Sequence, residues 1–188
     1  MSVKDRRYLI MGAAGGIGSA LCRRLTADGA KLLLAGRTEE KLSTLAGELG
    51  QPFAMCDATD SASVEDAFVR AEKDLGGLDG AVNCVGSLLL KPAHLTTDGE
   101  WRDTLARSLD SSFFLLRSAA KRLMKSGGSL VFLATAAAQT GLPNHEAIAA
   151  AKGGVIALAR SAAATYAARG IRVNCVAPGL VETPLPER

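Results

Sequence analysis

Four glycines lie close together near the start of the chain, in the segment LIMGAAGGIG that begins at Leu9. They are Gly12, Gly15, Gly16 and Gly18. Glycine has no Cβ atom, so it can form a tight turn and let another group approach the backbone closely. A helix beginning near Gly16 would point its free N–H groups and its positive dipole end at an anion. This arrangement, which includes Ile17, predicts a phosphate-binding turn; a glycine-rich turn without a ligand is the competing interpretation.

Short apolar runs alternate along the chain with longer segments of helical spacing. The runs typical of strands are 8–11, 31–35, 52–56, 80–85, 129–134 and 171–176, and helical spacing occurs at 17–25, 64–71 and 145–168. Strands buried on both faces need no polar alternation, so this order predicts parallel strands joined by crossover helices. The expected fold class is α/β, a Rossmann-type doubly wound parallel sheet with helices on both faces. A ligand would bind at the carboxyl ends of its strands.

Length and composition limit the possible functions. A chain of 188 residues with 48% hydrophobic content can bury one sizeable core, so we expect a single domain over residues 1–188. The charges are scattered, with a net charge of +3, and aromatic residues make up 4% of the chain, so nucleic acid is not an expected partner. No segment approaches the ~20 apolar residues that cross a bilayer, so we expect no membrane partner. The four cysteines lack metal-ligand spacing, which predicts reduced thiols in a cytoplasmic protein without a metal site.

The glycine spacing GxxxGxG resembles the fingerprint of the short-chain dehydrogenase/reductase family and differs from the GxGxxG of other dinucleotide folds. Further matches follow in the family's order: Cys56-Asp57 closing the third predicted strand, Asn83-Cys84-Val85-Gly86 after the fourth, Lys152 in a long helix, then Pro178-Gly179 and Thr183. Together they cover nearly the whole chain. The resemblance implies hydride transfer between a nicotinamide cofactor and a small carbonyl or alcohol substrate. It also implies a homodimer or homotetramer.

The resemblance assigns roles around the cofactor. Asp57 would contact the adenine, Asn83 and Gly86 would line the cofactor and steady the central strand, and Thr183 would hold the nicotinamide carboxamide. Two plainer interpretations remain open: Asp57 could help to cap the following helix, and Pro178-Gly179 could be an ordinary turn. The candidate cofactor-binding residues are Gly12, Gly16, Ile17, Gly18, Arg37, Asp57, Asn83, Gly86, Lys152, Pro178, Gly179 and Thr183.

The residues after the second predicted strand favour NADP(H) over NAD(H). NAD-selective proteins place an acid there that binds the ribose 2′-hydroxyl, whereas this chain has Gly36 and Arg37. Glycine leaves room for a 2′-phosphate, and a guanidinium can bind it through paired, charge-assisted hydrogen bonds. The alternative is that Arg37 is a solvated charge paired with Glu39 or Glu40.

The catalytic pattern of the family is altered. The resemblance implies a tyrosine four residues before Lys152, whose phenol donates a proton to the substrate oxygen while the lysine lowers its pKa. Ile148 stands at that position, and a hydrocarbon side chain cannot donate a proton. Thr135 replaces the family's serine, and Ser108 replaces its asparagine. The candidate catalytic residues are therefore Lys152, Thr135 and Ser108.

Two other residues are candidate replacements for the missing proton donor. Tyr166 lies fourteen residues beyond Lys152, or ~21 Å along a helix axis, so it is too far away. His145 is closer and titrates in the right range, although an exposed histidine near a helix start is the plainer interpretation.

Three hypotheses for the function follow. The chain is an NADP(H)-dependent oxidoreductase with an unrecognised proton donor, or a catalytically weak or inactive dinucleotide-binding protein with an interaction role. In the second case the helix at 145–168 would pack against a symmetry mate. The third hypothesis is that the chain carries deliberate substitutions or a truncation. The end of the chain, from Pro184, resembles a break within a loop, so the last strand of the family's sheet is expected to be missing.

Overall fold

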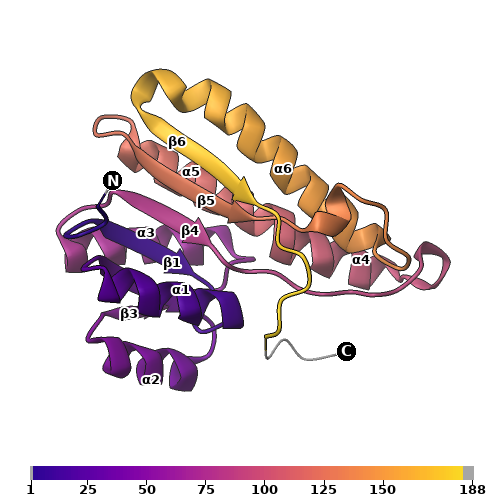
Figure 1. Cartoon of the computed structure of the whole chain (residues 1–188), viewed down its shortest axis with the longest axis horizontal. Coiled ribbons are helices and arrows are strands. Elements are labelled where there is room, and N and C mark those ends of the chain that lie inside the picture. Colours follow the sequence, from indigo (N-terminus) through magenta and orange to yellow (C-terminus); the bar gives the residue numbers. More distant parts are fainter. Residues whose placement is uncertain (1, 184–188) are drawn as a thin grey trace.

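The structure is a computed structural model that describes residues 2–183. Its strands are β1 (Arg7–Met11), β2 (Lys31–Gly36), β3 (Phe53–Met55), β4 (Gly80–Asn83), β5 (Gly128–Leu133) and β6 (Ile171–Val176). They form one parallel sheet in the order β3-β2-β1-β4-β5-β6 (Figure 1). The predicted fold class and all six predicted strands are confirmed.

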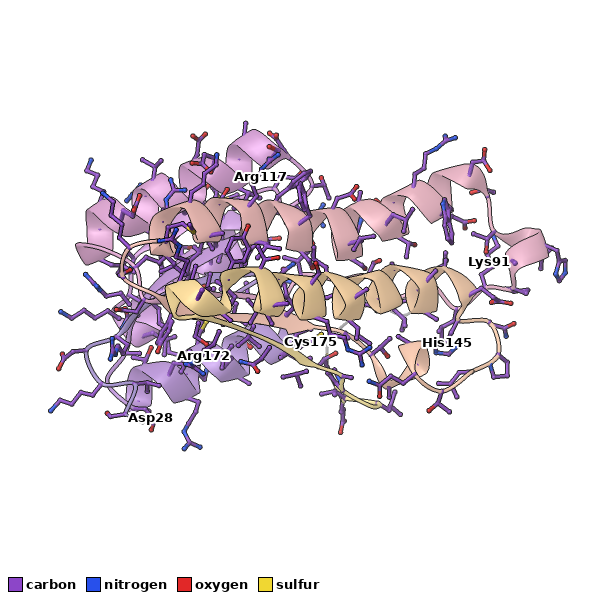
Figure 2. All side chains as sticks on the ribbon, turned by 90° about the horizontal axis from the view of Figure 1, so that it is seen from above. Asp28, Lys91, Arg117, His145, Arg172 and Cys175 are labelled. Atoms are coloured by element: carbon purple, nitrogen blue, oxygen red, sulfur yellow. The ribbon has the colours of Figure 1, made fainter. Side chains whose placement is uncertain are left out.

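The helices lie on both faces of this sheet. They are α1 (Gly16–Ala27), α2 (Glu39–Leu49), α3 (Ser61–Leu75), α4 (Asp98–Leu105), α5 (Ser111–Leu123) and α6 (Glu146–Tyr166), with the short helices η1 (Ala93–Leu95), η3 (Ala136–Ala138) and η4 (Ala167–Arg169). A π-helical turn, η2 (Ala106–Asp110), joins α4 to α5. From above, α4, η2 and α5 run beside α6 (Figure 2).

The side chains of β1 point alternately to the two faces of the sheet, so this strand contributes to both hydrophobic cores. Leu9 and Met11 pack with α3, α5 and α6 on one face, whereas Ile10 packs with α1 and α2 on the other. Successive side chains of a strand point to opposite faces, so a strand at the centre of a doubly covered sheet must be apolar throughout.

The strand order reverses between β1 and β4. After β1 the chain moves outward through β2 to β3, and after β4 it moves the other way through β5 to β6. The loops that leave these two neighbouring strands therefore diverge at their carboxyl ends. Open α/β sheets bind their ligands in the crevice that this divergence creates.

Helix α6 corrects the expectation that no segment approaches the length and apolarity of a membrane span. Residues Glu146–Arg169 form a 24-residue helical stretch that is long and apolar enough to cross a membrane. In the fold this helix packs along β6 and η2, as the core helix of a folded domain does, so its composition is weak evidence for a membrane span (Figure 1). Residues 177–183 form no strand, and the predicted break from Pro184 lies outside the described residues.

Candidate functional site

The glycine turn lies between β1 and α1, where glycine is required. Gly12 has φ = +79°, and a Cβ atom there would lie 2.9 Å from the carbonyl carbon of Cys84 and from the amide nitrogen of Val85. A Cβ atom on Gly18 would collide with the carbonyl oxygen of Gly12, so α1 can approach the turn this closely only without a side chain. Helix α1 begins at Gly16, and its N-cap, Gly15, offers no side-chain cap to the free N–H groups.

A cavity of about 410 Å³ opens at this edge of the sheet. Of the predicted cofactor residues, it brings together Gly12, Gly16, Ile17, Arg37, Asp57, Gly86, Lys152, Pro178 and Thr183. Gly18, Asn83 and Gly179 are not among its lining residues. Gly18 and Asn83 instead contact the backbone of the segments that line it. The cavity is also lined by residues that the sequence did not single out, among them Lys41, Ser87 and Arg107. These come from three different segments, so no local pattern could have linked them.

Asp57 faces the cavity in a fixed orientation. Its carboxylate accepts hydrogen bonds from the backbone N–H of Thr59 at 2.9 Å and from the Thr59 hydroxyl at 2.7 Å. These two bonds hold the pKa of Asp57 below its usual range, and the positive charges of Arg37 and Arg107 act in the same direction. The interpretation of Asp57 as a helix cap is wrong, because the cap of α3 is Asp60, which accepts from the Ala62 N–H.

Asn83 ties the central strand to a helix. Its side-chain amide donates to the hydroxyls of Ser111 at 3.1 Å and Ser112 at 3.0 Å, and its Oδ1 accepts from the N–H of Val85 at 3.0 Å. Only 2% of the residue is exposed. This amide therefore holds the end of β4 against α5 and sets the path of the loop that lines the cavity.

Arg37 directly follows β2 and lines the cavity. Among residues 2–183 it forms no ion pair, so the expected alternative of pairing with Glu39 or Glu40 is not seen. Lys41, in the first turns of α2, lines the same end of the cavity.

Lys152 is the candidate catalytic residue that reaches the cavity. It is 6% exposed, and its ammonium donates to the carbonyl oxygen of Leu133 at 2.7 Å. Burial lowers the pKa of Lys152 from its ordinary value of 10.5 to about 8, although the nearby Cys175 and Cys84 act weakly in the opposite direction. The loop after β4 comes close, since a Cβ atom on Gly86 would lie 3.4 Å from the ammonium nitrogen.

The other catalytic candidates do not line the cavity. Ile148 is 4% exposed and packs in the interior of the fold. The Thr135 hydroxyl accepts from the N–H of Ala137 and caps η3. Ser108 is fully buried in the π-helical turn, and its hydroxyl has no hydrogen-bond partner in the described part of the chain.

Neither considered replacement for the tyrosine reaches the site. His145 is the N-cap residue of α6, and its Nδ1 lies 2.7 Å from the carbonyl oxygen of Pro143 (Figure 2). Tyr166 is the last residue of α6, at the opposite end of the same helix. The cavity therefore holds a lysine and no tyrosine or histidine among its lining residues.

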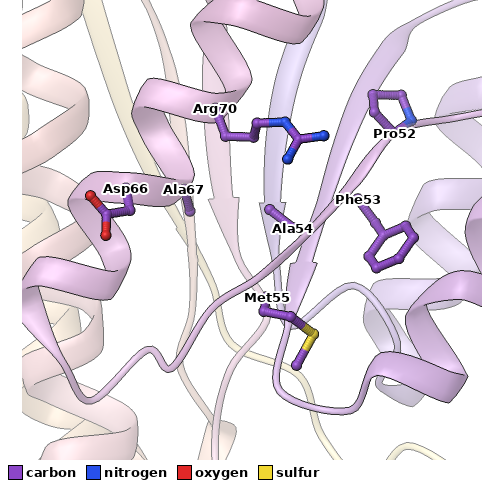
Figure 3. A pocket seen from close by; sticks show the side chains of 7 residues that line it. All are labelled: Pro52, Phe53, Ala54, Met55, Asp66, Ala67 and Arg70. Carbon is purple, nitrogen blue, oxygen red and sulfur yellow. The ribbon is translucent and has the colours of Figure 1, made fainter.

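A second cavity, of about 580 Å³, lies at the outer edge of the sheet between β3 and α3 (Figure 3). It is lined by Pro52, Phe53, Ala54, Met55, Asp66, Ala67 and Arg70. It contains none of the predicted site residues and no glycine turn, so we do not assign it to the cofactor. Within residues 2–183 no cluster of residues could hold a metal ion, and the cysteines are free.

Substitution of Lys152 by methionine is expected to stabilise the protein at neutral pH. The lowered pKa means that the folded state binds this proton less tightly than the unfolded chain, so stability rises with pH from about 8 to about 10. Below pH 8 both states are protonated, and the full desolvation cost, at most about 3 kcal/mol, opposes folding. After the lost hydrogen bond is subtracted, Lys152→Met should raise the free energy of unfolding at pH 7 by about 1–2 kcal/mol.

Urea unfolding of both proteins at pH 7 and near pH 10.5 measures this effect, with Lys121→Met as an exposed control on α5. The difference between the Lys152 variant and the unaltered protein should shrink at the higher pH. An equal difference at both pH values would contradict the assigned cause.

Comparison with known proteins places this chain among oxidoreductases. The sequence profile of the enoyl-(acyl carrier protein) reductase family matches residues 12–188. D-threitol dehydrogenase of Mycolicibacterium smegmatis is 35% identical over 94% of this chain and 70% of its own length. The 3-oxoacyl-[acyl-carrier-protein] reductase FabG of Salmonella typhimurium is 32% identical over 98% of this chain and 77% of its own length.

Solved structures are similar as well. A short-chain type dehydrogenase/reductase from Mycobacterium ulcerans has a TM-score of 0.94 and 29% identity, covering 98% of this chain and 71% of that one. Levodione reductase has a TM-score of 0.93 and 31% identity, covering 97% of this chain and 74% of its own. These matches agree with the parallel, doubly wound fold. The chain belongs to the short-chain dehydrogenase/reductase family, whose oxidoreductases act on small carbonyl or alcohol compounds with a nicotinamide dinucleotide.

Proposed function

We propose that this chain is a single nucleotide-binding domain that binds NADP(H) in preference to NAD(H) and turns over small carbonyl compounds weakly or not at all. The observation that carries the cofactor preference is the end of β2. Gly36 and Arg37 line the cavity there together with Lys41, and no acid competes for a ribose hydroxyl. Two cations beside an open glycine favour a 2′-phosphate over a bare ribose.

The described residues fit a dinucleotide along the whole cavity. The uncapped N-terminus of α1, at Gly16 and Ile17, suits the pyrophosphate. Asp57 would accept a hydrogen bond from the adenine, and Lys152 would hold the nicotinamide ribose. Pro178, Gly179 and Thr183 would shape the nicotinamide end. When bound, NADPH supplies a hydride.

The proposal of weak turnover rests on Ile148. Hydride addition to a carbonyl leaves negative charge on oxygen, which needs a proton from a positioned acid. General acid catalysis is typically worth ~10²- to 10⁴-fold in rate, so its loss slows the reaction without removing cofactor affinity. Neither the hydroxyl of Thr135 nor that of Ser108 lines the cavity, so we do not expect either to compensate.

An active oxidoreductase is the second candidate. Lys152 lines the cavity with its pKa lowered to about 8 and has no carboxylate partner among the described residues, so it is available to polarise a substrate oxygen. The relatives named above are dehydrogenases and reductases, which favours the same candidate.

For the whole protein we propose a cytoplasmic homodimer or homotetramer. Phe113 on α5 is an exposed aromatic side chain, stacked with Arg117, on the helix that runs beside α6. An exposed aromatic side chain of this kind suits contact with a second copy.

Isothermal titration with NADPH and NADH, followed by an assay of NADPH oxidation, tests the proposal. The substrate panel should include sugar alcohols and 3-oxoacyl compounds, which match the names of the relatives. We expect NADPH to bind at least tenfold more tightly than NADH, with little turnover. Turnover by the unaltered protein would favour the second candidate, and equal or absent binding of both nucleotides would refute the cofactor preference. Turnover that appears only in Ile148→Tyr would show that the proton donor is the one group that the site lacks.

A further inference from the structure

Two arginines from distant segments meet at one end of the cofactor cavity. Arg37 follows β2, and Arg107 lies in the π-helical turn between α4 and α5. Both line the cavity of about 410 Å³, and both also line the adjoining hollow of about 450 Å³ beyond Ser87. π-Helical turns are rare and recur at functional sites, so a charged side chain directed into the cavity from such a turn needs an explanation.

Arg107 is held in place in a way that leaves most of its donors available. Its Nε donates to both carboxylate oxygens of Asp103, each at 2.7 Å, and the side chain is 23% exposed. Its two Nη groups have no hydrogen-bond partner within residues 2–183. A guanidinium fixed at Nε keeps the planar, paired donors that match a phosphate.

The charges at this end of the cavity are unbalanced. Arg37, Lys41 and Arg107 line it, whereas the acids are Asp57 among the lining residues and Asp103, which pairs with Arg107. The Asp57 carboxylate already accepts two hydrogen bonds from Thr59, and both arginines lie close enough to lower its pKa. The three cations outnumber the two acids, so a net positive charge remains and favours an anion.

We propose that Arg107 and Arg37 together bind the 2′-phosphate of NADP(H), one from each side, so that Arg107 is a specificity-determining residue. The inference rests on the proposed NADP(H) preference and extends it to a residue outside the β2 loop. The hydrogen bond from Nε to Asp103 orients Arg107 before the cofactor arrives, which lowers the entropy lost on binding. Two guanidinium groups on one phosphate also make the affinity dependent on ionic strength.

Titration of NADPH, NADH and adenosine 2′,5′-bisphosphate into Arg107→Met tests this role. We expect the Kd for NADPH and for the bisphosphate to rise at least tenfold and the Kd for NADH to change less than twofold. The matched control is Arg102→Met on the preceding helix α4, whose side chain is 77% exposed and pairs with Asp98. It should change none of the three constants.

Arg107→Lys keeps the charge without the paired donors and should give an intermediate Kd for NADPH; it also serves if the methionine variant does not fold. An equal loss of NADPH and NADH affinity would assign Arg107 to the adenine instead, and unchanged binding would remove it from the site. Either result overturns the inference while leaving the NADP(H) preference of the unaltered protein intact. If the unaltered protein itself does not prefer NADPH, both the proposed function and this inference fail.

Discussion

Gly18→Ala should lower the free energy of unfolding by about 3 kcal/mol, because the added methyl group has no space. It would meet the carbonyl oxygen of Gly12 and the Cα atom of Ala13, which are backbone atoms and cannot move aside without shifting the whole turn. For a chain of this length the loss corresponds to a fall in Tm of roughly 6–12 °C. Because the turn would open, the affinity for NADPH should fall as well.

Thermal and urea unfolding measure the effect, and Gly153→Ala is the matched control. Gly153 lies inside α6, and a Cβ atom there would meet no atom within 4 Å. Alanine exceeds glycine in helix propensity by about 1 kcal/mol, so this variant should be slightly more stable than the unaltered protein. If Gly18→Ala is as stable as the control, the close approach of α1 to the turn is not required.

Asn83→Ala should cost about 3 kcal/mol of stability and loosen the cofactor cavity. The substitution removes the donors that bond to Ser111 and Ser112 and leaves the N–H of Val85 without its acceptor. Buried polar groups that lose their partners carry their full desolvation cost, and such networks act cooperatively. Val85 and Gly86 line the cavity, so the release of this loop should also weaken NADPH binding.

Urea unfolding and NADPH titration of the same variant measure both effects. Asn174→Ala is the control, because Asn174 is exposed on β6 and its side chain forms no hydrogen bond in the described residues. Its stability should stay within about 0.5 kcal/mol of the unaltered protein. A stable Asn83→Ala protein with unchanged affinity would mean that the loop after β4 is held by other contacts.

The course of β1 and β2 was predictable because burial on both faces leaves a direct mark on the sequence. Both strands are continuous apolar runs, and neither shows the polar alternation of a half-exposed strand. The third strand is shorter than predicted, at Phe53–Met55, where it pairs with β2 at the edge of the sheet. The glycine turn was equally readable, since a positive φ at Gly12 and the contact at Gly18 each restrict the residue type.

The catalytic candidates depended on tertiary structure. Lys152, Thr135 and Ser108 were selected by resemblance, and the fold brings Lys152 alone of the three to the cavity. The positions of hydroxyl groups depend on local backbone bonds: Thr135 caps η3, whereas Ser108 is turned inward by the π-helical turn. Likewise, either Asp57 or Asp60 could have capped α3, and the path of the chain after β3 gave this role to Asp60.

The sequence by itself determined the apolar strands, the glycine turn after β1, and the glycine and arginine, rather than an acid, at the end of β2. These features arise from residue type and short spacing, on which sterics and burial act directly. Only the tertiary structure brought Arg107 beside Arg37, aligned Asn83 with two serines of α5, and buried Lys152 against the Leu133 carbonyl. Each of these contacts joins segments far apart in the chain, and packing of helices on the sheet, which leaves no local mark in the sequence, decides where such segments meet.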